Sequence, residues 1–166
     1  MIQRIQSVFL FLVFASSLAA FFFPIASFWG DLYVIKLGVL GIEEQFPYDA
    51  NWPDTILLPV ILGLTGLLAF FTIFLYKRRL VQLRLIRFDL LLNIVYLALI
   101  FFYYVPDLET LTDTNADYIS EPGIYLSIVS VVFLILGNRF IRKDEKLVGL
   151  ARIEPEDDTA DESEGE

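Results

Sequence analysis

Hydrophobic and polar positions alternate along this chain in long blocks. Four apolar runs lie at about residues 5–28, 54–76, 88–105 and 122–138, and charged or mixed segments separate them. A helix needs roughly 20 apolar residues to cross the hydrocarbon core of a bilayer, so each run predicts one transmembrane helix. The pattern therefore predicts an all-α integral membrane protein whose four transmembrane helices form two antiparallel hairpins.

The first run also has features of a secretory signal peptide. A short apolar stretch, Val8 to Ala15, precedes the small residues Ser17-Leu18-Ala19, which resemble a cleavage site. However, the apolar run continues through Phe21-Phe22-Phe23 beyond that point. This continuation favours a retained transmembrane helix over a cleaved leader.

The first outer loop, between the first two runs, is expected to contain extended structure. Leu32 to Ile42 is rich in Val, Ile, Leu and Tyr and is interrupted by glycines, which predicts a short β-hairpin or paired strands. The aromatic residues that flank the membrane crossings here are expected to lie in the headgroup layer as anchors. They are Trp29, Tyr33, Tyr48 and Trp52.

Small residues in the second run predict a helix-packing face. Gly63, Gly66 and Ala69 fall on nearly one side of a helix, where a neighbouring helix could approach closely. Pro59 is expected to kink or loosen the same helix. An alternative is a discontinuous helix that lines a substrate site, as in some transporters.

The third run carries two polar residues one helical turn apart. Asn93 is predicted to hydrogen-bond across helices and so to hold the bundle together. Asp89 lies at the inner edge of the run, where we expect it to pair with a nearby arginine rather than to carry protons.

Basic residues gather on one side of the predicted membrane. All of the chain's 12 Lys and Arg residues except Lys36 fall in segments that place them together, which the positive-inside rule assigns to the cytoplasm. Both termini are then cytoplasmic. The bases predicted to face the cytoplasm and to attract anionic lipids are Lys77, Arg78, Arg79, Arg84, Arg87, Arg139, Arg142, Lys143 and Lys146.

The last part of the chain divides from the rest by composition. Arg139 to Val148 predicts a mixed-charge amphipathic helix that leaves the membrane, and residues 151–166 are strongly acidic. Such a segment has too little apolar surface to offset its ordering entropy, so we expect a disordered cytoplasmic tail. An acidic docking segment for a basic partner is the alternative. We therefore divide the chain into a membrane domain, residues 1–150, and this tail.

Composition excludes much chemistry. The chain is 57% hydrophobic, carries a net charge of −9 and contains no Cys and no His, and its mean hydropathy is +0.64. Thiolate metal sites and histidine acid–base catalysis are therefore absent. We predict no catalytic, cofactor or metal site and no nucleic-acid partner. A non-enzymatic accessory subunit of a membrane complex is favoured, with a small oligomeric transporter or channel, and then an intramembrane enzyme, as alternatives.

Three segments carry a resemblance to a known family: the start MIQRIQSVFLFL, the LLLN after the first basic cluster, and the ending NRFIRKDEKLV. Together they resemble a family of short four-span bacterial membrane proteins known only as domain-of-unknown-function family 4293. The resemblance implies a four-helix inner-membrane protein of unassigned activity. The chain departs from the family pattern after Val148, where Gly149-Leu150 and the acidic tail replace a basic continuation.

Overall fold

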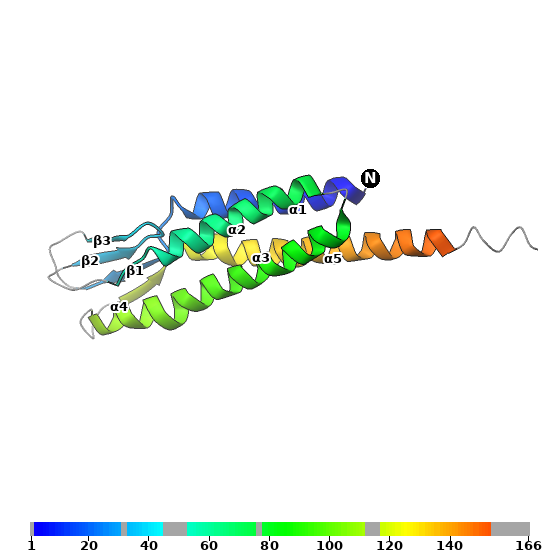
Figure 1. The fold of residues 1–166 in the computed structure, drawn as a ribbon. Helices are drawn as coiled ribbons and strands as arrows, with labels where there is room; N and C mark the ends of the chain where they lie inside the picture. The colour runs from blue at the N-terminus through cyan, green and yellow to red at the C-terminus, as the bar shows by residue number, and fades with distance from the viewer. Residues whose placement is uncertain (1, 31–32, 45–52, 76–77, 112–116, 154–166) are drawn as a thin grey trace, which may run out of the picture.

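The computed structural model describes residues 2–30, 33–44, 53–75, 78–111 and 117–153. Four long helices lie side by side, and a small β-sheet caps one end of them (Figure 1). The elements in chain order are α1 (Ile2–Ala20), β1 (Ala26–Trp29), β2 (Val34–Leu37), β3 (Ile42–Glu44), α2 (Leu57–Phe74), α3 (Arg79–Leu99), the π-helix η2 (Ile100–Tyr104), α4 (Val105–Leu111), β4 (Asp117–Ser120) and α5 (Pro122–Ile153).

The helices pack in a closed square. α1 contacts α2 and α5, and α3 contacts the same two helices from the other side. Successive helices run in opposite directions, so every packed pair is antiparallel (Figure 1). Within the described residues, the helices long and apolar enough to cross a membrane are Leu57–Phe74, Leu80–Leu111 and Pro122–Lys143, and a shorter apolar stretch, Ser7–Ala20, belongs to α1.

The first helix is shorter than the apolar run predicted. α1 ends at Ala20, whereas the run was expected to stay helical to Phe28. Pro24 has no N–H to continue a helix, and after it the backbone becomes extended, with Ile25 N donating to Leu37 O at 2.7 Å. The last residues of the predicted span are therefore strand β1.

The sheet has the order β3-β2-β1-β4, and all of its pairs are antiparallel. The paired strands predicted in the first outer loop are confirmed as β2 and β3. The sequence analysis missed β1 and β4, which pair although Ala26 and Ser120 are far apart in the chain. The predicted all-α class is thus corrected to a mostly helical fold with a small sheet.

Two prolines occupy helix positions that differ from those predicted. Pro59 is the third residue of α2, in the first turn, where backbone N–H groups have no intrahelical acceptor. It therefore removes no helical hydrogen bond, and the predicted kink is wrong. Pro106 follows the third apolar run, which was predicted to end at residue 105, but it lies inside α4, two residues after the π-helical turn. A π-helical turn widens the backbone locally, which accommodates the proline ring.

The third and fourth runs form longer helices than predicted. α3, η2 and α4 follow one another without a break from Arg79 to Leu111, so the predicted boundaries 88 and 105 both lie within helix. α5 is one helix of 32 residues and continues through the predicted limits at 138 and 150. It confirms the helix expected at Arg139 to Val148. Residues 154–166, most of the predicted tail, lie outside the described residues.

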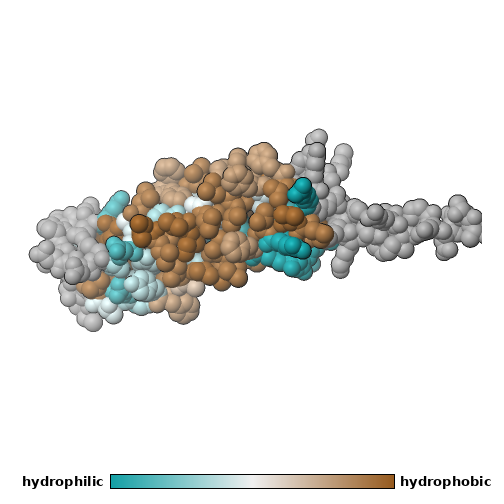
Figure 2. All heavy atoms as spheres, in the orientation of Figure 1, coloured by the Kyte–Doolittle hydropathy of each residue, from teal (hydrophilic) through white to brown (hydrophobic). Residues whose placement is uncertain are grey.

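Two apolar cores hold the fold together. One lies where the sheet meets the helices and includes Phe28, Ile35, Tyr104 and Leu108. The other lies toward the opposite end of the helices and includes Leu10, Ala69 and Ile141. Figure 2 shows a broad hydrophobic surface over the middle of the helices, with hydrophilic surface near the sheet and at the opposite end. We call that opposite end, where Arg78 and Arg142 lie exposed, the basic end.

Candidate functional sites at the rim and inside the bundle

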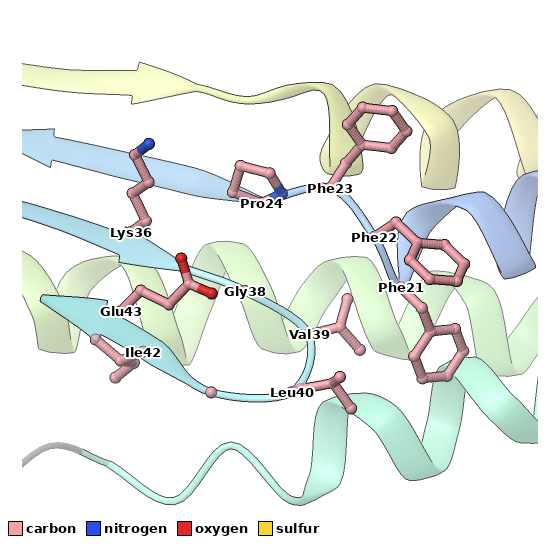
Figure 3. Close-up of a pocket in the computed structure, with 11 residues that line it drawn as sticks. Phe21, Phe22, Phe23, Pro24, Lys36, Gly38, Val39, Leu40, Ile42 and Glu43 are labelled. Atoms are coloured by element: carbon pink, nitrogen blue, oxygen red, sulfur yellow. The ribbon is translucent and has the colours of Figure 1, made fainter.

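A pocket opens where the sheet meets the helices (Figure 3). Its volume is about 340 Å³, and its walls come from the segment between α1 and β1 and from the β2–β3 hairpin. We call this the rim pocket, lined by Phe21, Phe22, Phe23, Pro24, Lys36 and residues 38–43. Its phenylalanines lie at the helix end, and Lys36 and Glu43 lie on the strands (Figure 3). Phe22 and Leu40 are 80% and 73% exposed, so the pocket offers open apolar surface.

The charged side of the rim pocket belongs to a polar row across the sheet. Lys36 is the cross-strand partner of both Ser27 and Glu43, so the three side chains share one face. Ser27 is fully buried; its hydroxyl donates to Glu121 Oε1 at 2.8 Å and accepts a hydrogen bond from Trp29 Nε1 at 3.1 Å. These bonds fix the orientation of the row relative to α5.

A second candidate site lies inside the bundle. The Asp89 side chain is 1% exposed, and neither carboxylate oxygen forms a hydrogen bond within the described part of the chain. Asn93 is equally buried, and both of its amide atoms lack such a partner. The predicted pairing of Asp89 with an arginine is therefore wrong, since Arg84 and Arg87 point to the exposed surface of α3. The cross-helix hydrogen bond expected of Asn93 is not formed with any described residue.

Helix contacts set the height of Asp89 in the bundle. Gln82 Nε2 donates to Thr72 O at 3.4 Å, so these residues lie at similar heights on antiparallel α3 and α2. Asp89 and Thr65 are each seven residues from that point in the direction of the sheet. At 1.5 Å per residue both lie about 10 Å along the bundle, and therefore at the same level.

A contact between Tyr96 and Ser127 relates the height of α5 to that of α3. The Tyr96 hydroxyl lies near that of Ser127, without the geometry of a strict hydrogen bond. Asn93 and Ser130 are each three residues from that contact toward the basic end, which is about 4.5 Å along both helices. Ser130 is 1% exposed, and its hydroxyl has no partner among the described residues. Asn93 and Ser130 thus lie at one level.

The first helix completes the set. A Cβ added at Gly66 would lie 3.5 Å from Ser17 Cβ, so Ser17 faces the middle of α2. Ser17 is also 1% exposed, and its hydroxyl is unpartnered among the described residues. By these offsets, Ser17, Thr65 and Asp89 lie at about one level along the bundle, and Asn93 and Ser130 lie roughly 6 Å nearer the sheet. We call them the polar layer: Ser17, Thr65, Asp89, Asn93 and Ser130.

The predicted packing residues lie between α1 and α2. An added Cβ would be 3.8 Å from Phe21 Cζ at Gly63 and 3.5 Å from Ser17 Cβ at Gly66, and Ala69 is fully buried on the same side. A shallow apolar groove of about 150 Å³ runs along this contact. Small residues thus allow the α1 and α2 backbones to approach closely.

The predicted basic residues are exposed wherever the structure describes their side chains. Arg79 and Lys146 are helical, but their side chains, like the whole of Lys77, lie outside the described part. The others are exposed: Arg78, Arg84, Arg87, Arg139, Arg142 and Lys143. Within the described residues, no group of three or more His, Cys, Asp and Glu is placed to hold a metal ion.

The spacing of polar residues along α3 is a sequence signal for the polar layer. Gln82, Asp89, Asn93 and Tyr96 follow one another at helical spacings of seven, four and three, so they share one face of α3. A polar face between apolar positions indicates an interior site in a membrane helix.

A comparison with known protein families gives a match over most of the chain. The family model described as Domain of unknown function (DUF4293) matches residues 2–152. No curated protein matches the sequence. The match covers every described helix and strand, apart from the last residue of α5.

Proposed function

Because this chain belongs to the DUF4293 family, whose description assigns no activity, we propose its role from its own geometry. We propose a multi-pass protein of the bacterial inner membrane that serves as a non-enzymatic accessory subunit of a larger membrane complex. Its helices anchor it in the bilayer, and its sheet is a binding platform at the outer surface.

The membrane placement is supported by helix length and surface hydropathy. α1 has 19 residues, or about 28 Å at 1.5 Å per residue, close to the roughly 30 Å thickness of a bilayer core. In our proposal it crosses the membrane with α2, the continuous α3–α4 helix and α5, as two antiparallel hairpins. The basic end and both termini are then cytoplasmic, since basic residues are retained on that side during insertion.

Exposed bases at the basic end support lipid contact. Arg139, Arg142 and Lys143 lie exposed on α5 at the basic end, and the last part of this helix extends past the other helices (Figure 1). Each base near an anionic leaflet contributes about 1 kcal/mol of attraction. Anionic lipids are therefore proposed partners at the cytoplasmic surface.

The open edges of the sheet are the observation that supports the accessory role. β3 and β4 are the edge strands of the sheet, so one side of each has no strand partner in the described structure. Open edges accept a further strand from another chain, with main-chain hydrogen bonds supplying affinity. A strand paired with β3 would also meet the rim pocket, where Phe22 and Leu40 add exposed apolar surface. Edge pairing next to an apolar pocket favours a protein partner or a second copy.

Site-specific photocrosslinking in cells tests this proposal. A photoreactive amino acid at Glu43, on β3, should give a discrete crosslinked species, and one at Asp117, on β4, tests the other edge. Val60 is the control because it is 60% exposed on the apolar surface of α2. The mass of the product distinguishes a partner from a homo-oligomer. Equal crosslinking at all three positions, or none at either edge, would refute the platform.

The polar layer favours a second candidate, a small oligomeric transporter or channel. Buried polar groups inside a membrane bundle often mark the path of a transported ion. Purified protein in sealed vesicles should then conduct a monovalent cation, and Asp89→Asn should abolish that flux. Absence of flux from the wild type would eliminate this candidate and leave the accessory role unaffected.

A further inference from the structure

Asp89 lies in the bundle interior without a described counter-charge. Its carboxylate is sealed from solvent, and the bases on the same helix, Arg84 and Arg87, are exposed on another face. The buried polar side chains nearest to its level on the other helices are uncharged: Ser17 on α1 and Thr65 on α2, with Ser130 on α5 about one turn nearer the sheet. A carboxylate in such surroundings requires a positive charge or a proton.

The neighbouring groups are the oxygen ligands that hard cations prefer. Asn93 supplies an amide oxygen one turn from Asp89, and Ser130 on α5 supplies a hydroxyl oxygen at the level of Asn93. Ser17 faces Gly66 of α2 and lines the groove between α1 and α2, so it is not counted among these ligands. Thr65 contributes less, since its hydroxyl already donates to Leu62 O at 2.8 Å. One carboxylate with several neutral oxygens balances a single positive charge.

We propose that the polar layer binds one alkali metal cation, held by Asp89, Asn93 and Ser130. The cation neutralises the buried carboxylate and links α3 and α5 through shared ligands. Binding of this kind stabilises the folded bundle whether or not the ion is transported. The site therefore does not depend on the accessory role proposed above.

The test is thermal unfolding of the full chain in detergent, in sodium, potassium or choline chloride at equal ionic strength. A ligand that binds only the folded state at ten times its dissociation constant raises the folded-to-unfolded ratio about elevenfold. We expect a saturable rise of the unfolding midpoint in sodium or potassium over choline. The arm with the larger rise identifies the preferred ion.

Two matched variants test whether Asp89 binds the cation. Asp89→Asn keeps the shape and removes the charge, so its midpoint should be the same in all three salts. Asp107→Asn makes the same chemical change farther along the continuous α3–α4 helix and should keep the wild-type response. If Asp89→Asn does not fold, Ser130→Ala decides, because loss of one ligand should shift the response to higher cation concentration. A wild type that melts equally in choline and alkali salts, or a Ser130→Ala response identical to that of the wild type, would overturn the proposal.

Discussion

Replacing Gly123 with alanine tests the junction between α5 and the segment that leads into β1. Gly123 N donates to Pro24 O at 2.9 Å. A Cβ at this position would lie 2.5 Å from Pro24 O and 2.8 Å from Phe23 O. Both atoms belong to the backbone, so they cannot move aside as a flexible side chain would. The substitution therefore requires the helix and the strand segment to separate.

The expected cost follows from opposing effects. Overpacking typically costs about 1–3 kcal/mol, and loss of the hydrogen bond to Pro24 adds about 1 kcal/mol. Alanine recovers up to about 1 kcal/mol through its higher helix propensity. We expect Gly123→Ala to lower the free energy of unfolding by about 2 kcal/mol, a change of roughly 30-fold in the unfolding equilibrium.

The assay is unfolding in mixed micelles followed by circular dichroism, with Gly66→Ala as the matched control. At Gly66 the added Cβ meets Ser17 Cβ at 3.5 Å, an ordinary van der Waals distance. This control should therefore be as stable as the wild type or slightly more stable. If both alanine variants unfold at the wild-type midpoint, the close approach at Gly123 does not exist and the reasoning fails.

Two further predictions concern the packing of α1 and the membrane topology. Gly66→Leu should lower the thermal midpoint in detergent, because it places a branched side chain against Ser17. Leu67→Ile, on the exposed side of α2, should leave the midpoint unchanged. Equal midpoints for the two variants would show that α1 does not pack against Gly66. In intact cells, Asp117→Cys on β4 should react with a membrane-impermeant thiol reagent. Arg78→Cys should not react, because the positive-inside rule places Arg78 in the cytoplasm. Labelling of Arg78→Cys would contradict the proposed topology.

The sequence predicted which segments are helical more accurately than it predicted the residues at which each helix begins and ends. The second apolar run matches α2 to within about three residues at each end, as expected when only apolar length decides a helix. The hydrophobic pattern of the first run could not show where its helix ends and its strand begins. Ala26 to Trp29 is apolar enough for a membrane helix and also suitable for a buried strand. β4 carries the alternating exposure of an edge strand, but its partner lies near the other end of the chain.

The candidate sites were harder to predict because they depend on how the helices align. Hydropathy alone placed Asp89 at the edge of the third apolar run. The helix actually begins at Arg79 and continues to Leu111, so Asp89 lies level with Thr65, near the middle of α2. Height in a bundle is set by contacts such as that between Gln82 and Thr72, which a single sequence does not reveal.

The pairing of β1 with β4 has a consequence for the order in which the protein assembles. β1 occupies an inner position of the sheet, yet its neighbour β4 comes about 90 residues later, which corresponds to roughly 5–20 s at ordinary rates of synthesis. During this interval α1 also lacks α5, one of the two helices that flank it. β4 and α5, which follow each other directly in the chain, thus complete the sheet and the bundle at nearly the same time. Until then, β1 presents an open edge on which a chaperone or a neighbouring chain can act.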